Sequence, residues 1–536
     1  MYKQCASGDF LAFAKQSLDV ADVPMNFDEV FRYQYCLTRS NLVPPKNWIL
    51  RKFRNWNLVH CALLNNTEIF DEHGTFLGIV LGISIHPEAG VLKENVTLSI
   101  SISEPEFWSV FEKFVYDLSG RYVIFASNAS EHRVYHDPVL DMASVYNKKQ
   151  HVVASSLLLA KSEKIISDYH IDLVDLYRDG RNISFGHTVD ADVKRAKPNH
   201  FLSLNSFKQT RWWPSPDTSF DAGRGLASQN VSFIIDKLKK NCHSMMSLPD
   251  VEIPLSGGRD SRNILACIGK NHLKNSEIFT IRTNVITSLD VLSARMISEK
   301  WNFPLREIDI FENQYADEFE PEKIRARRMA YFLANGLSGV SSSPADLVAN
   351  FRSSNDAVNI RGNIMDMIGG NQFKKLQSFE GVDIEHGLRR LSVCDPNDHR
   401  KFETWKAKYD AWVSQLPEAC LARVYDFAFF ELLLPNTLGG KGLISLNSSF
   451  RMNPFSDRSL LHLTASIRPK VRRRGILNNA IIEMAAPDLL DVPFTNELKK
   501  KPALVRKAVS SFSKIRFFPK ESARNYIGIT EELSKI

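Results

Sequence analysis

The sequence has few cysteines, and none of them belongs to a closely spaced pair. Seven are scattered through 536 residues, at Cys5, Cys36, Cys61, Cys242, Cys267, Cys394 and Cys420. An odd number without a CxxC motif argues against a disulfide framework and against a structural zinc site. Residues 1–9 contain no apolar signal core, and no apolar run is long enough to cross a bilayer. We therefore expect a protein of the reducing cytoplasm.

The chain also lacks a large excess of either charge. It has 68 Lys and Arg against 61 Asp and Glu, a net charge of +7. This is not the dense basic patch of a dedicated nucleic-acid-binding protein, so we expect no nucleic acid as partner, whereas an anionic substrate or a nucleotide would suit the charge. A hydrophobic content of 44% with 24% charged residues excludes the disordered and fibrous classes. The length predicts two or more domains.

A glycine turn between an apolar strand and an amphipathic helix lies near the middle of the chain. The strand is expected over 251–255 and the helix over 263–268, with the sequence SGGRDSR at 256–262 between them. Backbone N–H groups at such a turn and the positive end of the helix dipole can capture an anion. Ser256 and Ser261 can add hydroxyl donors, and Asp260 can bind the Mg²⁺ that accompanies a polyphosphate. An ordinary Gly-Gly turn capped by Asp or Ser is the structural alternative.

This loop lacks the lysine of the GxxxxGK[ST] phosphate loop. It resembles SGGxDS, the pyrophosphate-binding (PP-loop) motif of ATP pyrophosphatases of the asparagine synthetase type. Enzymes of that type cleave ATP between the α and β phosphates and so activate a substrate as its adenylate. The resemblance implies ATP and Mg²⁺ as cofactors. It implies a nucleotide site made of Leu255, Ser256, Gly257, Gly258, Asp260, Ser261, Thr280 and Gly362.

The residues after the loop alternate strand and helix. We expect strands over 277–282 and 305–310, with a helix over 290–300 between them. This βαβ series predicts a parallel sheet whose ligand site lies at the carboxyl ends of the strands. A helix over 223–246 precedes the loop, and we expect a domain boundary between residues 215 and 216.

A second motif lies at 357–370, where the resembled family carries v-l-x-G-E-G-x-D-E-x-x-G-G. Gly362 and Asp366 match it, as do the two glycines at 369–370, whereas Asn363 and Met367 stand in place of acids. The resemblance implies that Asp366 and Asp260 bind Mg²⁺ together, and two carboxylates suit a hard cation. A plain glycine-rich loop with a helix-capping Asp is the alternative. The missing Glu leaves the recognition of the amine substrate open.

The third signal is carboxy-terminal. The segment 450–457 resembles E-x-R-x-P-F-L-D, and its last residue, Asp457, is equally suited to cap a helix beginning at the next residue. The segment 469–480 resembles K-x-x-L-R-x-A, with Arg474 at the lysine that steadies the transition state and the pyrophosphate. An arginine can bind a phosphate but cannot release a proton at working pH, so Lys470 is a second candidate. The resemblance thus implies catalytic roles for Arg474, Lys470 and Asp366, and a solvated helix start is the alternative for the basic run.

The first part of the chain reads as several short strands separated by polar turns. We expect strands over 78–85, 96–102, 120–126, 133–138, 145–146 and 152–156, with a helix over 104–118. Together with the segment 185–214, these resemble the amidotransferase-like domain of asparagine and β-lactam synthetases. Asn199 replaces a glycine there, at a left-handed turn position. The expected fold is therefore an Ntn-type antiparallel, sandwich-like (α+β) domain over 1–215, followed by an α/β PP-loop domain over 216–536 with a parallel sheet and a basic helical carboxy-terminus.

The first domain departs from a working glutaminase. Glutaminases of the family use a cysteine at the mature N-terminus, next to the initiator Met. Here position 2 is Tyr2, and the nearest cysteine is Cys5. We interpret the domain as a scaffold without glutamine hydrolysis, as in β-lactam synthetases and lasso-peptide cyclases.

The predicted function is ATP-dependent amide-bond formation. A small-molecule or peptide carboxylate would be adenylated, and ammonia or a substrate amine would displace AMP, in specialised-metabolite, peptide or surface-polysaccharide biosynthesis. The alternatives are a non-catalytic descendant that binds a nucleotide or a partner, and another PP-loop enzyme such as a tRNA-modifying one. A homodimer is left open. Arg259 and Arg262 are expected to add two positive charges beside the loop, and the basic tail 499–520 is suited to an anionic surface or to solvent.

Overall fold

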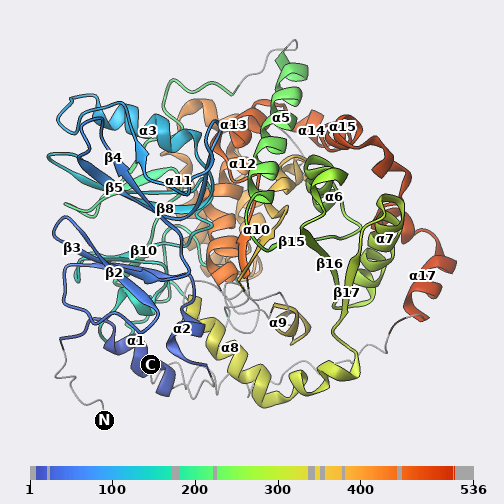
Figure 1. The fold of residues 1–536 in the computed structure, drawn as a ribbon, viewed down its shortest axis with the longest axis horizontal. Coiled ribbons are helices and arrows are strands. Elements are labelled where there is room, and N and C mark those ends of the chain that lie inside the picture. The colour runs from blue at the N-terminus through green and yellow to red at the C-terminus, as the bar shows by residue number, and fades with distance from the viewer. Residues whose placement is uncertain are drawn as a thin grey trace.

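Two kinds of β-sheet divide the chain in the computed structural model (Figure 1). Strands up to residue 211 form two mainly antiparallel sheets, and strands from residue 251 onward form one parallel sheet, so the fold is mixed α/β. The structure describes residues 8–20, 25–171, 176, 181–220, 226–335, 344–350, 356–376, 381–443, 449–510 and 512.

The first part contains two sheets and a few helices. One sheet has six strands in the order β12-β10-β11-β1-β3-β2, and the other has the order β14-β13-β9-β8-β5-β4-β7, with β6 added beside β5. The elements are α1 (Ala12–Val20), α2 (Phe27–Val30), β1 (Tyr35–Thr38), β2 (Trp48–Phe53), β3 (Trp56–Cys61), β4 (Asn66–Phe70), β5 (Phe76–His86), β6 (Gly90–Val91), β7 (Val96–Thr97), α3 (Phe107–Asp117), β8 (Ser119–Ser127), β9 (His132–His136), β10 (Val145–Asn147), β11 (Val152–Ala154), β12 (Val193–Arg195), β13 (His200–Ser203) and β14 (Gln209–Arg211).

The two sheets pack face to face, and α3 covers the outer face of the second one (Figure 1). Successive side chains of a strand point to opposite faces, and β8 shows both environments. Phe125 faces the first sheet, with its ring centroid 5.8 Å from that of Tyr35. Tyr122 and Ile124 face the other way and pack with Phe111 of α3. Both faces of β8 are therefore buried, which explains its nearly continuous apolar sequence.

Most of the predicted elements of this part are confirmed, with two corrections. The strand expected over 96–102 is only Val96–Thr97, because the chain bends away after its short parallel pairing with β4. The three strands β1, β2 and β3 were not predicted, since their aromatic residues follow no clear period. Two aromatic residues of this part, Phe31 and Trp56, are fully buried, both 0% exposed. Asn199 has the predicted left-handed conformation, with φ of 62°.

The parallel sheet has five strands in the order β17-β16-β15-β18-β19. Its strands are β15 (Val251–Pro254), β16 (Ser276–Arg282), β17 (Leu305–Asp309), β18 (Ala357–Ile360) and β19 (Ser449–Met452). The α-helices of this part are α5 (Leu226–Met246), α6 (Arg259–Ile268), α7 (Val285–Trp301), α8 (Pro321–Asn335), α9 (Pro344–Asn350), α10 (Ile384–Leu391), α11 (His399–Val413), α12 (Val424–Ala428), α13 (Arg458–Ser466), α14 (Pro469–Arg472), α15 (Ile476–Ala485), α16 (Thr495–Leu498) and α17 (Pro502–Ser510).

The strand order of this sheet reverses at β15. From β15 the chain first adds β16 and β17 on one side, and it then returns to add β18 and β19 on the other. In open α/β sheets, ligands bind where the strand order reverses, outside the carboxyl ends of the strands. The loops that follow β15 and β18 meet at this point. The parallel sheet and the helix after β15 confirm the prediction for this segment, although α6 begins at Arg259 and α7 at Val285, earlier than the expected 263 and 290.

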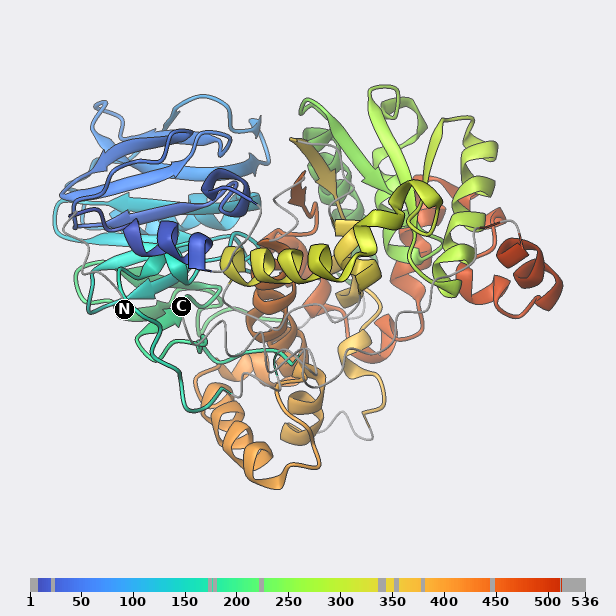
Figure 2. The ribbon, with the colours of Figure 1, turned by 90° about the horizontal axis from the view of Figure 1, so that it is seen from below.

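The two parts share contacts across a broad junction. Figure 2 shows α8 running from the parallel sheet toward the first part, where the Gln34 side chain donates to the carbonyl of Ala334 at 2.9 Å. The guanidinium of Arg458, at the start of α13, is fully buried and donates to the carbonyl of His136 and to the hydroxyl of Tyr122. The side chain of Asp457 accepts a hydrogen bond from the backbone N–H of Leu460 and so caps α13. This is the helix-capping role predicted for Asp457 as one of two alternatives.

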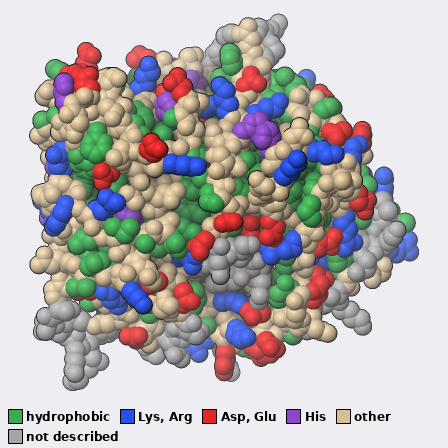
Figure 3. Space-filling model, in the orientation of Figure 1, with side chains coloured by type: hydrophobic (Ala, Val, Ile, Leu, Met, Phe, Trp, Pro, Cys, Tyr) green, Lys and Arg blue, Asp and Glu red, His purple; other side chains and the backbone are tan. Residues whose placement is uncertain are grey.

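Charged side chains of both signs are interspersed on the face seen in Figure 3. This agrees with the small net charge of the sequence. Within the part of the chain that the structure describes, no helix combines the length and the apolar character needed to cross a membrane.

Candidate functional site

A cavity of about 410 Å³ opens at the carboxyl ends of β15 and β18, where the strand order reverses. Its walls come from the loop after β15, the end of β16, the first turns of α7 and the loop after β18. The lining residues are Pro254, Leu255, Ser256, Asp260, Ser261, Phe279, Thr280, Ile281, Thr287, Asp290, Arg361, Gly362, Asn363 and Asp366. Six of the eight residues expected to bind the nucleotide thus line one cavity, although they come from three separate segments.

The loop after β15 is held in shape by its two serines. The hydroxyls of Ser256 and Ser261 lie 2.9 Å apart, and the Ser261 hydroxyl also accepts from the backbone N–H of Ser256 at 3.1 Å. Gly258 is the N-cap of α6, and no side chain caps this end of the helix. The first N–H groups of α6 are therefore available to an anion in the cavity.

Gly257 is needed for close packing, not for an unusual backbone conformation. A Cβ at this position would lie 2.1 Å from the hydroxyl of Thr495 and 2.8 Å from the Cβ of Ser293. The N–H of Gly257 donates to a carboxylate oxygen of Asp290 at 3.1 Å, and the Thr495 hydroxyl donates to the same oxygen at 2.6 Å. Neither Gly257 nor Gly258 has a positive φ or lines the cavity. Gly257 thus anchors the loop to α7 and α16.

Asp260 and Asp366 face the same cavity from the two loops. A Cβ on Gly362 would lie 3.1 Å from the backbone carbonyl carbon of Asp260, so the glycine lets the second loop pack directly against the first. Burial, followed by the negative charge of Asp366, raises the pKa of Asp260 to about 7. Asp366 accepts a hydrogen bond from the side chain of Asn371 at 2.9 Å. The two carboxylates were predicted to act together, and the cavity brings them together.

These two carboxylates fit a hard divalent cation. Within the described ranges, no group of three or more His, Cys, Asp and Glu side chains is close enough to form a complete metal site. Mg²⁺ commonly uses one or two protein carboxylates and completes its shell with phosphate oxygens and water. The charge that raises the pKa of Asp260 is the charge that a cation between the two acids would neutralise. Asp260 and Asp366 are therefore the residues that could bind Mg²⁺.

Arg361 is a cation of this cavity that the sequence reasoning missed. It lies directly before Gly362, and its Nε donates to the side chain of Asn359 at 2.9 Å. Burial lowers the pKa of Arg361 to about 10, so the group stays charged at neutral pH. A half-buried guanidinium that lines the same cavity as two acids can bind a phosphate or a carboxylate. Its position next to the matching glycine of the second motif was the available signal.

The two arginines of the first loop have different surroundings. Arg259 is exposed, and its guanidinium lies 4.8 Å from the ring centroid of Phe494. Arg262 is fully buried and donates to the backbone carbonyls of Leu489 and Val492. The expectation of two flanking positive charges is therefore wrong for Arg262, which ties α6 to the carboxy-terminal segment.

Lys470 and Arg474 are exposed, and neither lines the cavity. The buried member of this basic run is Arg472, which pairs with Asp426 and donates to the carbonyl of Met367 at 2.6 Å. Arg472 thereby attaches the basic run to the second loop. Lys470 and Arg474 lie on the solvent side of the same turn, so the structure does not bring them together with Asp260 and Asp366.

The two positions where acids were missing also differ from each other. Asn363 lines the cavity, whereas Met367 is fully buried in the core. A core side chain at 367 has no access to a ligand. Only position 363 of the pair is therefore able to contact a substrate.

The segment with Tyr2 and Cys5 lies outside the described residues, as do residues 513–536. All six cysteines in the described part are free and buried, among them Cys36, whose pKa is raised by burial. None of these six is suited to act as an exposed thiolate.

Comparison with known proteins adds no family to this description. No protein-family model matches the sequence, and no curated protein matches it significantly.

Proposed function

We propose that this chain is an ATP-dependent amide-forming enzyme of the asparagine synthetase type, with an Ntn-like first domain that lacks glutaminase activity and a PP-loop domain that contains the active site. ATP would occupy the cavity at the ends of β15 and β18. Its reaction partners would be a small-molecule or peptide carboxylate and an amine or ammonia.

One observation carries this proposal. The SGGRDS loop and the loop with Asp366 come from strands that are adjacent in space, and their two acids share one cavity at the reversal of the strand order. That arrangement combines an uncapped helix N-terminus for phosphate with two carboxylates for a cation. An ordinary Gly-Gly turn that bound no ligand would not require a second carboxylate, Asp366, in the same cavity.

The chemistry assigns a task to each group. A carboxylate oxygen of the substrate attacks the α-phosphorus of ATP, and the bond from the α-phosphorus to the bridging oxygen of the β-phosphate breaks, which releases pyrophosphate. The amine nitrogen then attacks the acyl carbon, AMP leaves, and the nitrogen loses a proton to solvent. The N–H groups at the start of α6 bind the pyrophosphate as its charge develops, and Arg361 orients an anionic group of either substrate. Mg²⁺, held by Asp260 and Asp366, would supply charge neutralisation at the phosphates.

A second candidate function is nucleotide binding without transfer. It is favoured by the exposed positions of Lys470 and Arg474 and by the burial of Met367. In that case the cavity would bind Mg²⁺ and ATP, and no adenylate would form.

Exchange of radiolabelled pyrophosphate into ATP separates the two candidates, because adenylate formation is reversible and needs no amine. We expect exchange that depends on one carboxylate from a panel of amino acids, peptides and sugar acids. Binding of ATP without exchange for any of them would favour the second candidate. Lys470→Met and Arg474→Met would then be compared with Lys406→Met, a charge change on α11: a selective loss of exchange would assign one of them to the transition state.

A further inference from the structure

A second cavity lies at the junction of the two parts of the chain. It has a volume of about 180 Å³ and shares no lining residue with the first one. Its walls come from the segment 184–197, from α11 and from the π-helical turns η7 (Phe429–Leu433) and η8 (Pro435–Gly440). The lining residues are Ser184, Phe185, Gly186, His187, Arg195, Ala196, Lys197, Lys408, Ala411, Trp412, Gln415, Glu431, Leu432, Pro435 and Asn436.

Cations outnumber anions in this lining. Arg195, Lys197 and Lys408 contribute three positive charges, and Glu431 is the one carboxylate among these residues. Burial lowers the pKa of all three cations, that of Arg195 to about 9. Three charges held at a partly desolvated wall attract an anion more strongly than the same charges would in water.

The single carboxylate is already fully engaged. Arg211 binds Glu431 through both guanidinium nitrogens, at 2.5 and 2.8 Å. The indole N–H of Trp412 and the side-chain amide of Asn199 donate to the same carboxylate. Burial alone would raise the pKa of Glu431, but Arg211 brings the net pKa below its usual value. Arg211 therefore balances the charge of Glu431 from behind the wall, although Glu431 still favours the charged form of Lys197.

A carboxylate–imidazole–amine chain fixes one of the cations. The Nδ1 of His187 lies 2.8 Å from a carboxylate oxygen of Asp168, and its Nε2 lies 2.9 Å from the Nζ of Lys408. An ammonium can only donate, so Nε2 accepts from Lys408 and the ring proton sits on Nδ1, facing Asp168. Lys408 is thereby held toward the segment 184–197, although it belongs to α11.

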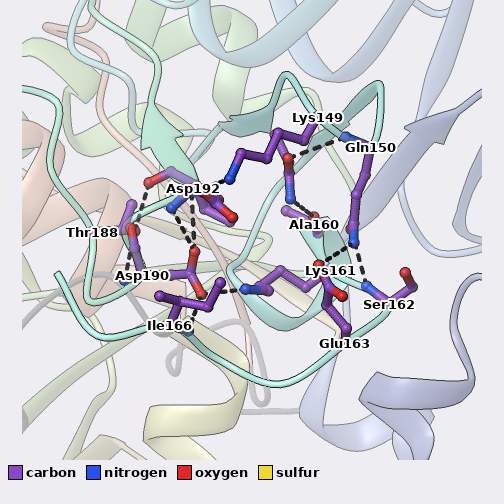
Figure 4. A network of polar contacts seen from close by, with 12 residues as sticks. Lys149, Gln150, Ala160, Lys161, Ser162, Glu163, Ile166, Thr188, Asp190 and Asp192 are labelled. Atoms are coloured by element: carbon purple, nitrogen blue, oxygen red, sulfur yellow. Dashed lines mark hydrogen bonds and ion pairs between the residues drawn. The ribbon is translucent and has the colours of Figure 1, made fainter.

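The loop that forms this wall is itself rigidly anchored (Figure 4). The carboxylate of Asp190 and the ammonium of Lys161 form an ion pair in which both side chains are 0% exposed. Asp190 also accepts from the backbone N–H groups of Ile166, Asp192 and Val193. Figure 4 shows the side chain of Lys161 pointing toward Asp190. The cavity is therefore preformed on the side of residues 184–197.

The other walls are apolar and aromatic. Phe185 is partly buried and stacks on Trp405 of α11, with 5.8 Å between the ring centroids. Trp412, Leu432 and Pro435 complete this side of the lining. A site with separate cations on one side and aromatic surface on the other suits a ligand that has both a charged and an apolar end.

We propose that this cavity binds a small organic carboxylate with an apolar or aromatic group. The carboxylate is bound by Lys197 and Lys408, and the apolar group lies against Phe185 and Trp412. The site is independent of the nucleotide cavity and of the function proposed for it.

Ligand-observed ¹⁹F NMR of the full chain with 4-fluorobenzoate tests this site. We expect saturable binding that unlabelled benzoate competes away, and that acetate, inorganic phosphate and 4-fluorobenzylamine displace much less or not at all. Lys197→Met and Lys408→Met each lose a charge-assisted contact, so affinity should fall at least about tenfold. Lys408→Arg should keep most of the affinity. Lys406→Met, on the same helix but outside the lining, and Asp260→Asn, in the other cavity, are the matched controls and should leave binding unchanged.

Several results would overturn the proposal. These are the absence of saturable binding to the wild-type chain at millimolar concentration, wild-type affinity in both methionine variants, and displacement by phosphate as effective as by benzoate. Near-UV circular dichroism establishes that each variant is folded. If Lys408→Met unfolds, Lys197→Met decides the question by itself, because its side chain donates no hydrogen bond to any residue in the described part of the chain.

Discussion

The two cavities of this chain have opposite chemistry. The first, at the reversal of the parallel sheet, presents Asp260 and Asp366, and the second, between the two parts of the chain, presents Lys197 and Lys408. In both cavities, burial shifts the pKa in the direction that favours the uncharged form of the side chain. It raises the pKa of Asp260 and lowers the pKa of Arg195. Burial of charge is thus the common cause that suits the two sites to ligands of opposite charge. A bound cation would stabilise the buried carboxylates of the first cavity, and a bound anion would stabilise the buried cations of the second.

The wall of the basic cavity offers the largest expected effect on stability. Lys161→Met leaves Asp190 buried without its ionic partner, and we expect a loss of about 3–5 kcal/mol in the free energy of unfolding. Urea unfolding followed by circular dichroism measures it. Lys149→Met, whose exposed side chain pairs with Asp192, should change the midpoint little. Equal effects of the two variants would show that the buried pair does not hold this wall.

The acidic cavity should depend most strongly on its second carboxylate. Asp366→Asn removes one of the two groups suited to Mg²⁺, so we expect Mg²⁺ affinity or pyrophosphate exchange to fall at least about 100-fold. The same change removes a negative charge that raises the pKa of Asp260. That pKa should fall but stay above 3.8, because burial is its larger cause. Isothermal titration with Mg²⁺ at several pH values measures both effects.

The packing of the first loop should have a smaller, structural effect. Gly257→Ala places a methyl group against Thr495 and Ser293, and we expect a loss of about 2 kcal/mol together with weaker nucleotide binding. Gly442→Ala is the control, since its added Cβ has no close contact, within 4 Å, with any packed residue in the described part of the chain. An unchanged free energy of unfolding in Gly257→Ala would mean that the loop can move away from α16 without loss of stability.

The pH dependence of the metal site should be the mildest effect. In the free protein, Asp260 holds a proton below a pKa of about 7, and Mg²⁺ must displace it. Affinity is therefore highest above that pH and should fall by up to about tenfold per unit as the pH drops below it. Calorimetry in two buffers of different ionisation enthalpy would detect the released proton. A flat affinity between pH 5 and 8, about the range that brackets this pKa, would show that Asp260 is not a ligand.

The difference between the cavities also explains what the sequence could predict. The acidic site was predicted because its loop is continuous in sequence. The loop joins a strand to a helix through a glycine turn, a pattern that is able to bind an anion. Asp366 could be paired with Asp260 only through the resemblance, since about a hundred residues separate them. Arg361 was missed although it adjoins the matched glycine, because an arginine at a strand end has many roles.

The basic site could not be predicted, because its residues come from three distant segments. Lys197, Lys408 and Glu431 are brought together only by the packing of α11 and the π-helical turns against the first part of the chain. Tertiary packing likewise determines which arginines are buried. Arg262 and Arg472 are buried and hydrogen-bonded to other segments, whereas Arg474 is exposed. The sequence shows where the arginines are, but it does not show which guanidinium donates hydrogen bonds to a buried carbonyl or carboxylate.

The central claim concerns the cavity at the ends of β15 and β18. The most direct test is the rate at which AMP forms from α-labelled ATP, with Mg²⁺, ammonia or an amine, and the carboxylate identified by pyrophosphate exchange, in the wild-type chain, in Asp260→Asn and in Asp217→Asn. The last variant changes an exposed acid outside the cavity. We predict that AMP formation falls by at least about 100-fold in Asp260→Asn and is unchanged in Asp217→Asn. Equal rates in all three chains, or no AMP from the wild-type chain with any carboxylate, would contradict the claim.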